Sequence, residues 1–119
     1  LIADRGYESY NNIAHLDNKG WKYLIRVKAS NRQKGILYKT NLPIDKEFDQ
    51  IISIQMTRRS TNEIKSKPWI YRLLINKSPF HFFHIGSKQN YLITFRVVGV
   101  KIANGKYEYI ITNFKKRKS

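Results

Sequence analysis

The 119-residue sequence contains no cysteine, which excludes a disulfide-bonded scaffold and a zinc site with thiolate ligands. Acidic residues are also few, with 8 Asp and Glu against 23 Lys and Arg. No apolar run approaches the roughly 18 residues of a membrane-spanning helix, and the first residues lack the basic-then-apolar pattern of a secretory signal. These absences predict a soluble protein of the cytoplasm that has no membrane partner.

Basic residues give the chain a formal net charge of +15. So large an excess of one sign on a small body attracts polyanions, and nucleic acid is therefore the expected partner. A solvated basic surface without a specific partner is the alternative. The length predicts a single domain, and 41% hydrophobic residues are sufficient for a buried core.

The first thirty residues predict a strand, a helix and a second strand. Residues 1–3 are apolar and a polar segment with a glycine follows them, which is typical of the end of a buried strand. Apolar residues recur at helical spacing within residues 7–16, and Gly20 supplies a helix stop. Residues 23–27 alternate as in a strand with one apolar side. Because the sequence opens inside an apolar run and its only methionine is Met56, we expect a piece of a longer protein.

A polar connector at residues 29–35 marks the predicted boundary to a β-rich region. Alternating apolar residues predict strands at residues 52–56 and 69–75, each with one buried face. Residues 57–67 lie between these strands and predict a polar, basic loop. No helix is expected beyond the connector.

Asn104 and Gly105 predict a β-hairpin near the end of the sequence. This pair favours a two-residue turn with both residues at positive φ. A hairpin folded there places Lys101 opposite Glu108, so that opposite charges face each other. The apolar phase changes upstream, which predicts a β-bulge near residues 97–98.

Asp4 is a candidate functional residue because it stands where a buried strand ends and the chain turns toward a helix. The ends of strands in α/β folds hold functional side chains in fixed and accessible positions. A carboxylate in this place can bind a hard cation such as Mg²⁺. The alternative is that Asp4 only closes a local turn or caps the helix.

Basic residues form two clusters that suit contacts with DNA phosphates. One extends from the second predicted strand into the connector, and the other occupies the predicted basic loop. A solvated surface is the alternative for each cluster. The predicted DNA-binding residues are Arg26, Lys28, Arg32, Lys34, Arg58, Arg59, Lys65 and Lys67.

Several segments together resemble the second acidic region of DDE transposases. An apolar strand precedes residues 4–7, Asp-Arg-Gly-Tyr, and residues 8–13 follow as Glu-Ser-Tyr-Asn-Asn-Ile. Residues 23–28, Tyr-Leu-Ile-Arg-Val-Lys, are similar to the family's strand that ends in Ile-Arg-x-Lys. Residues 109–113, Tyr-Ile-Ile-Thr-Asn, are similar to the Leu-x-Thr-Asn end of its β-rich insertion. The closest resemblance is to the bacterial insertion sequence family four.

The resemblance implies that Asp4 is the second acid of an Asp-Asp-Glu triad that holds Mg²⁺ for DNA strand cleavage and transfer. The family's first Asp would lie before Leu1 and its Glu beyond Ser119. Glu63, in the basic loop, and Glu108, on the hairpin, are poor substitutes. One carboxylate alone holds Mg²⁺ weakly because this ion keeps its waters and relies on several anionic ligands. We therefore expect the isolated chain to be inactive.

The resemblance also implies an α+β fold. Residues 1–30 correspond to part of a ribonuclease H-like catalytic core, strand-helix-strand, and residues 31–119 to a β-rich antiparallel insertion in a separate layer. The implied partners are transposon ends and target DNA in a bacterial nucleoid. A core strand without its upstream neighbours leaves a bare sheet edge, which predicts a homodimer. The alternative function is a non-catalytic, basic, β-rich module that binds nucleic acid.

Overall fold

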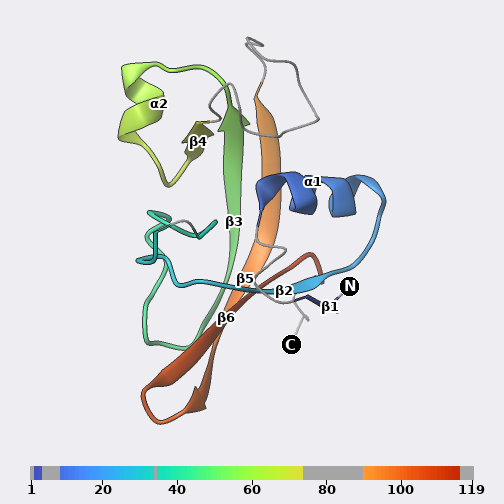
Figure 1. Ribbon diagram of the computed structural model, residues 1–119, viewed down its shortest axis with the longest axis vertical. Coiled ribbons are helices and arrows are strands. Elements are labelled where there is room, and N and C mark those ends of the chain that lie inside the picture. Colours follow the sequence, from blue (N-terminus) through green and yellow to red (C-terminus); the bar gives the residue numbers. More distant parts are fainter. Residues whose placement is uncertain (1, 4–8, 34, 74–89, 116–119) are drawn as a thin grey trace.

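The strands form a six-stranded sheet in the order β1-β2-β6-β5-β3-β4 within the part of the chain that the structure describes. The structure is a computed structural model, and it describes residues 2–3, 9–33, 35–73 and 90–115. Figure 1 shows the elements in chain order. They are β1 (Ile2–Ala3), α1 (Tyr10–Asn18), β2 (Leu24–Val27), β3 (Phe48–Thr57), α2 (Asn62–Ser66), β4 (Tyr71–Leu73), β5 (Tyr91–Ala103) and β6 (Lys106–Thr112).

The predicted strand, helix and strand at the start of the chain are confirmed as β1, α1 and β2. Strand β1 pairs in parallel with β2, with Ala3 opposite Ile25. On its other side β2 pairs antiparallel with β6, which pairs antiparallel with β5. The later strands therefore continue the same sheet, and the expectation of a separate layer is wrong. The fold is mixed α/β; the division at residue 30 stays a prediction.

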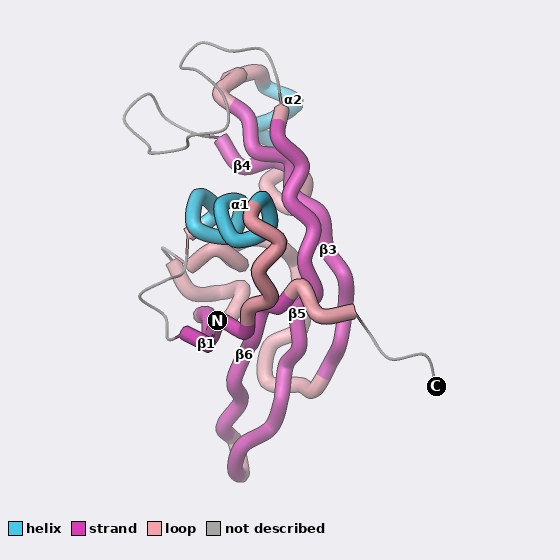
Figure 2. Tube along the Cα trace, turned by 90° about the vertical axis from the view of Figure 1, so that its right-hand side faces the viewer, coloured by secondary structure: helices cyan, strands magenta, loops and turns pink. Residues whose placement is uncertain are grey.

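Helix α1 begins three residues later than predicted because Ser9 caps it. The side chain of Ser9 accepts a hydrogen bond from the backbone N–H of Asn12 at 3.1 Å, which satisfies a donor at the helix start. Gly20 follows the helix with φ of +71°, a conformation that favours glycine and is common just after helices. The helix lies against one face of the sheet (Figure 2).

The core lies between α1, the connector and one face of the sheet. Its members alternate along the strands, as expected of a sheet with one buried side. Apolar side chains of this kind stabilise the fold by about 25 cal/mol for each Å² removed from water. The buried core residues on the helix and strands are Ile13, Ala14, Leu16, Ile25, Val27, Ile54, Met56, Ile93, Phe95, Val97, Tyr109 and Ile111.

The segment that follows the connector, residues 36–42, contributes to this core. Ile36, Leu37 and Leu42 are buried. The hydroxyl of Ser30 donates to the backbone oxygen of Leu42 at 2.9 Å. The hydroxyl of Tyr10 donates to the backbone oxygen of Ile36. The segment after β2 is therefore tied to both α1 and the core.

The β5–β6 hairpin turns at Asn104 and Gly105, as predicted, but its turn differs from the expected type. Of these two residues only Gly105 has a positive φ, at 71°. A turn with both central residues at positive φ is therefore not formed.

The register of this hairpin also differs from the prediction. Val100, and not Lys101, lies opposite Glu108. The register shifts between Lys101 and Ala103, so the bulge lies beside the turn and the predicted bulge at residues 97–98 is wrong. The buried residues of β5 alternate from Ile93 to Gly99, so the phase of burial does not change at residues 97–98.

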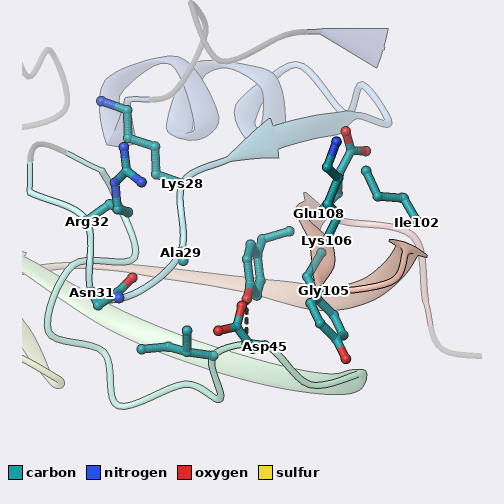
Figure 3. A pocket seen from close by; sticks show the side chains of 12 residues that line it. Lys28, Ala29, Asn31, Arg32, Asp45, Ile102, Gly105, Lys106 and Glu108 are labelled. Carbon is teal, nitrogen blue, oxygen red and sulfur yellow. Dashed lines mark hydrogen bonds between the residues drawn. The ribbon is translucent and has the colours of Figure 1, made fainter.

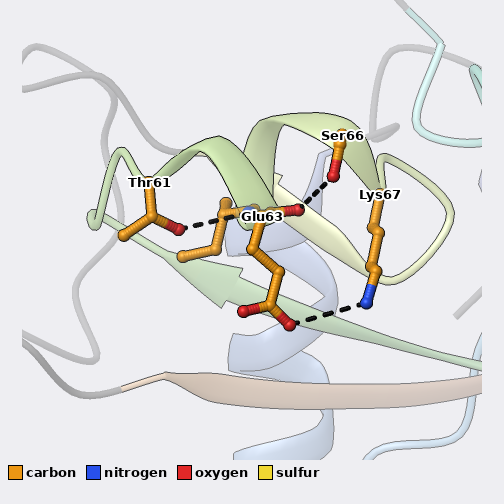
Figure 4. Close-up of polar contacts among 5 residues, drawn as sticks. Thr61, Glu63, Ser66 and Lys67 are labelled. Carbon is orange, nitrogen blue, oxygen red and sulfur yellow. Dashed lines mark hydrogen bonds and ion pairs between the residues drawn. The ribbon is translucent and has the colours of Figure 1, made fainter.

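Helix α2 replaces the predicted loop between β3 and β4 (Figure 4). The hydroxyl of Thr61 accepts from the backbone N–H of Ile64 at 3.2 Å, and the hydroxyl of Ser66 donates to the backbone oxygen of Glu63 at 2.8 Å. Ile64 is buried. The cap and this apolar residue explain why a short helix forms in a polar segment.

Strand β4 covers only part of the strand predicted at residues 69–75. Trp69 precedes β4 in a turn and is exposed, as is Leu73 at its end. Ile75 lies outside the described residues. The buried face expected of this strand is therefore absent from its described part.

Thr112 and Asn113 join the end of β6 to the segment between α1 and β2. The hydroxyl of Thr112 donates to the backbone oxygen of Tyr23 at 2.7 Å. The side-chain oxygen of Asn113 accepts from the N–H of Tyr23 at 3.0 Å, and its nitrogen donates to the backbone oxygen of Trp21 at 2.7 Å. We refer to these contacts as the Thr-Asn clamp.

We expect Asn113→Ala to lower the free energy of unfolding by about 2 kcal/mol, because it removes two hydrogen bonds to backbone groups at roughly 1 kcal/mol each. Chemical denaturation followed by circular dichroism measures the change. Tyr23→Phe is the matched control, since the Tyr23 hydroxyl is buried and has no hydrogen-bond partner among the described residues. Removing that hydroxyl leaves stability equal or higher. Equal losses in both variants would show that the clamp contributes nothing.

Candidate nucleic-acid interface

A groove of about 390 Å³ lies between the connector that follows β2 and the β5–β6 hairpin (Figure 3). One wall comes from the connector and the other from the hairpin, segments that are far apart in the sequence. The groove is lined by Lys28, Ala29, Asn31, Arg32, Ile44, Asp45, Ile102, Gly105, Lys106, Tyr107, Glu108 and Tyr109.

Three basic side chains line this groove. Lys28 and Arg32 lie beside each other on the connector wall, and Lys106 lies on the hairpin wall (Figure 3). Arg32 and Lys106 are exposed and make no ion pair with the described residues. Basic side chains are common partners of phosphate oxygens, and cations on two walls of one groove can contact the same polyanion.

The sheet fixes the start of the connector wall. Val27 pairs with Tyr109, so Lys28 leaves the sheet directly beside the hairpin. The backbone N–H of Arg32 donates to the oxygen of Ala29 at 3.0 Å, which closes a turn at the groove. This backbone hydrogen bond holds Arg32 in place at the groove. The buried Ser30 anchors the same turn to the core.

The floor of the groove is held by Asp45 and Tyr109. Asp45 has φ of 56°, and its backbone N–H donates to the hydroxyl of Tyr109 at 2.9 Å (Figure 3). Tyr109 is buried. This bond connects the loop before β3 to the centre of β6.

Arg26, one of the predicted DNA-binding residues, has its guanidinium paired with Glu108 at 2.7 Å, and its contact with DNA stays a prediction. Glu108 also lines the groove. The ion pair neutralises this carboxylate, which would otherwise offset the positive charge of Lys28, Arg32 and Lys106. Arg26 thus has a neighbouring carboxylate as its partner, and its expected pairing with phosphate gains no geometric support.

The predicted basic residues after β3 lie far from this groove. Helix α2 is at one end of the molecule and the hairpin turn at the other (Figure 1). Lys67 is paired with Glu63 at 3.5 Å (Figure 4), and Arg58 is half-buried. Arg59 and Lys65 are exposed. The described members of the predicted set therefore lie in two separate regions of the molecule.

Two of the predicted site residues, Asp4 and Lys34, lie outside the described residues. Strand β1 nevertheless fixes where the chain leaves the sheet before Asp4. Because β1 and β2 are parallel, their carboxyl ends meet at the same edge of the sheet. The connector wall of the groove begins at this same edge, directly after Val27.

The described residues contain no group of three or more His, Asp or Glu side chains that could hold a metal ion. The role of Asp4 as a metal ligand stays a prediction, and the described residues contain no cluster of further ligands that could bind the ion with it. Among the described helices, none is long and apolar enough to cross a membrane.

A second arginine, Arg96, is also paired with a carboxylate. Its guanidinium donates two hydrogen bonds to the carboxylate of Asp49, at 2.7 and 2.6 Å. These hydrogen bonds raise the pKa of Arg96. The pair lies on the sheet face opposite α1, since the neighbours Phe95 and Val97 are buried.

Sequence reasoning missed Asn31 and Lys106 as groove residues. Lys106 and Tyr107 follow the Asn-Gly turn directly, so the predicted hairpin places them near one another. Nothing in the sequence indicates that this hairpin lies beside the connector, because that contact depends on the pairing of β2 with β6.

A sequence profile of the family described as Transposase DDE domain matches residues 1–83 of the chain. The matched region includes all elements from β1 to β4. Neither the curated proteins nor the solved structures give a match to this chain. Because the match covers more than half of the 119 residues, the chain belongs to the transposase DDE domain family.

Proposed function

We propose that this chain is part of a DDE transposase of the insertion sequence family four type, which cleaves transposon ends and transfers them to target DNA in a bacterial nucleoid. The observation that carries this proposal is a basic groove that begins directly after the end of β2. Family membership supports the reaction class. The groove supports a polyanionic substrate.

Asp4 is the proposed catalytic residue of the chain and a ligand of Mg²⁺. Bound Mg²⁺ ions stabilise the entering and leaving oxygens of phosphoryl transfer. Because the carboxylate of Asp4 is one of three that this reaction needs, the chain alone holds the ion too weakly for cleavage. The proposed role of the described residues is to bind the DNA backbone next to that site.

We expect Asp4→Asn in the whole transposase to reduce Mg²⁺-dependent cleavage of transposon-end DNA to the level without metal. The amide keeps the size of the side chain but loses the negative charge that holds the ion. Gel assays of strand cleavage measure the loss, and filter binding of the same DNA serves as the control because binding remains unchanged.

The 119-residue chain alone does not cleave DNA strands when Mg²⁺ is present. Metal-dependent nicking by this chain that is lost in Asp4→Asn would contradict the need for the two other acids. DNA binding by the whole protein with no cleavage under any metal would instead favour the alternative, a non-catalytic binding module.

We expect the groove to carry most of the affinity for duplex DNA. Arg32→Gln/Lys106→Gln weakens binding on the order of tenfold at low salt, and it lowers the slope of log affinity against log salt by about two. Arg59→Gln/Lys65→Gln, near α2, removes the same charge and is the matched control with a smaller effect. Fluorescence anisotropy across a salt series measures both. A larger loss in the α2 variant would place the DNA at the other end of the molecule.

We also propose that the chain forms a homodimer through the outer edge of β1. Within the described residues β1 pairs only with β2, and an unpaired strand edge offers hydrogen-bonding groups to a second copy. Sedimentation of the 119-residue chain is expected to show a dimer at high concentration. A monomer throughout the concentration range would refute the pairing.

A further inference from the structure

A second pocket, of about 360 Å³, lies between the strands β3 and β5 and the segment that follows β6. It shares no lining residue with the basic groove. The residues of this pocket that matter below are Ile51, Thr94, Arg96, Thr112, Phe114 and Lys115.

The floor of the second pocket is the face of the sheet away from α1. Ile51 lies opposite Arg96 in the ladder, and Arg96 lies opposite Thr112. Residues directly opposite each other on neighbouring strands point to the same face, so these three form a row across β3, β5 and β6. Ile51 is 64% exposed, so this row presents an apolar side chain to its surroundings.

The wall of the second pocket is the short segment after β6. The backbone N–H of Phe114 donates to the hydroxyl of Thr112 at 3.0 Å, and the Thr-Asn clamp holds the same hydroxyl against Tyr23. Phe114 is 46% exposed. Figure 2 shows this segment beside β3 on the side away from α1. The wall is therefore fixed in advance, which lowers the entropic cost of binding.

The charges around the second pocket are not those of a phosphate site. The guanidinium of Arg96 donates two hydrogen bonds to Asp49, which neutralises it. Asp49 is two residues from Ile51 on β3, so its carboxylate lies on the same face. Lys115 is exposed and makes no ion pair with the described residues. In the sequence it begins a run of four basic residues.

These features favour one kind of occupant. Exposed apolar side chains on a floor and a wall suit an apolar side chain between them, and the cation of Lys115 suits a carboxylate beside it. A nucleic acid would bring phosphates close to the carboxylate of Asp49. A second copy in a two-fold contact would set its own basic segment against this one, and like charges across an interface are unfavourable.

We propose that the second pocket docks an acidic segment of a protein partner. An apolar side chain of the partner lies between Ile51 and Phe114, and a neighbouring carboxylate pairs with Lys115. This inference goes beyond the proposed function, because it assigns a protein partner to a face of the sheet that the basic groove does not use.

Three labelled hexapeptides test this inference with the 119-residue chain by fluorescence anisotropy. The first is Glu-Asp-Leu-Phe-Asp-Glu, the second replaces Leu-Phe by Ser-Ser, and the third replaces every acid by its amide. We expect the first peptide to bind about tenfold more tightly than the second, since only the first buries apolar side chains. It also binds about tenfold more tightly than the third, which lacks carboxylates for the basic surface.

Ile51→Ser and Phe114→Ser are expected to lower the affinity for the first peptide to that for the second. Both side chains are exposed, so their loss leaves the core intact. Leu73→Ser is the matched control with unchanged affinity, because Leu73 is an exposed aliphatic residue of β4 that does not line the pocket. Lys115→Gln weakens binding about threefold, as expected of an exposed ion pair, and Lys115→Arg restores it.

Equal binding of the first two peptides overturns the inference, as does an equal loss in Leu73→Ser. Loss of peptide binding in Arg32→Gln/Lys106→Gln alone also overturns it, because the peptide then occupies the basic groove. Oligothymidine binding that is lost in Phe114→Ser would assign the pocket to nucleic acid instead, and a dimer that dissociates in Ile51→Ser would assign it to a second copy. Duplex binding at the groove is measured separately, so this inference can fail while the proposed function stands.

Discussion

The arrangement of the whole sheet depends on the central position of β6. This strand pairs with β2 on one side and β5 on the other, so it is the link between the β1–β2 pair and the strands that follow the connector. The Thr-Asn clamp reinforces this link from the end of β6, with hydrogen bonds to Trp21 and Tyr23. Removing β6 would separate the sheet into two parts, each with an unpaired edge.

The groove is a direct consequence of that link. Its connector wall follows β2, and its hairpin wall belongs to β5 and β6. Pairing Val27 with Tyr109 therefore assembles the groove as well as the sheet. The same pairing brings Arg26 to Glu108, so charge neutralisation at the groove is built into the register of two strands.

Local patterns in the sequence predict most strands and α1 because period-two and helical spacings reflect which side chains are buried. They fail where a short-range feature competes with the pattern. The bulge at Ile102 shifts the hairpin register, the cap at Thr61 produces α2 in a polar segment, and buried residues such as Leu37 follow directly after a connector of polar composition. Each of these depends on contacts that the pattern does not contain.

The candidate site is less predictable than the fold. Charge alone indicates Lys28 and Arg32, but it indicates Arg26 equally, and only the geometry shows that this guanidinium has a carboxylate partner. Lys106 enters the site through pairing of distant strands. The sequence indicates Asp4 as a catalytic residue because it stands at a strand end and because the segment resembles the family. Asp4 lies outside the described part of the chain.

The position of β6 also constrains the order in which the chain can fold. Thr112 and Tyr23, which are joined by the clamp, are 89 residues apart in sequence, and contacts between distant residues slow folding because a long loop must close before they form. During synthesis, β2 emerges long before its neighbour β6 and waits with an unpaired edge. Strands β5 and β6 can form their hairpin locally, so the slow step is the docking of this hairpin against β2. Completion of the sheet and creation of the basic groove are then a single event, and a partly folded chain has no preformed groove.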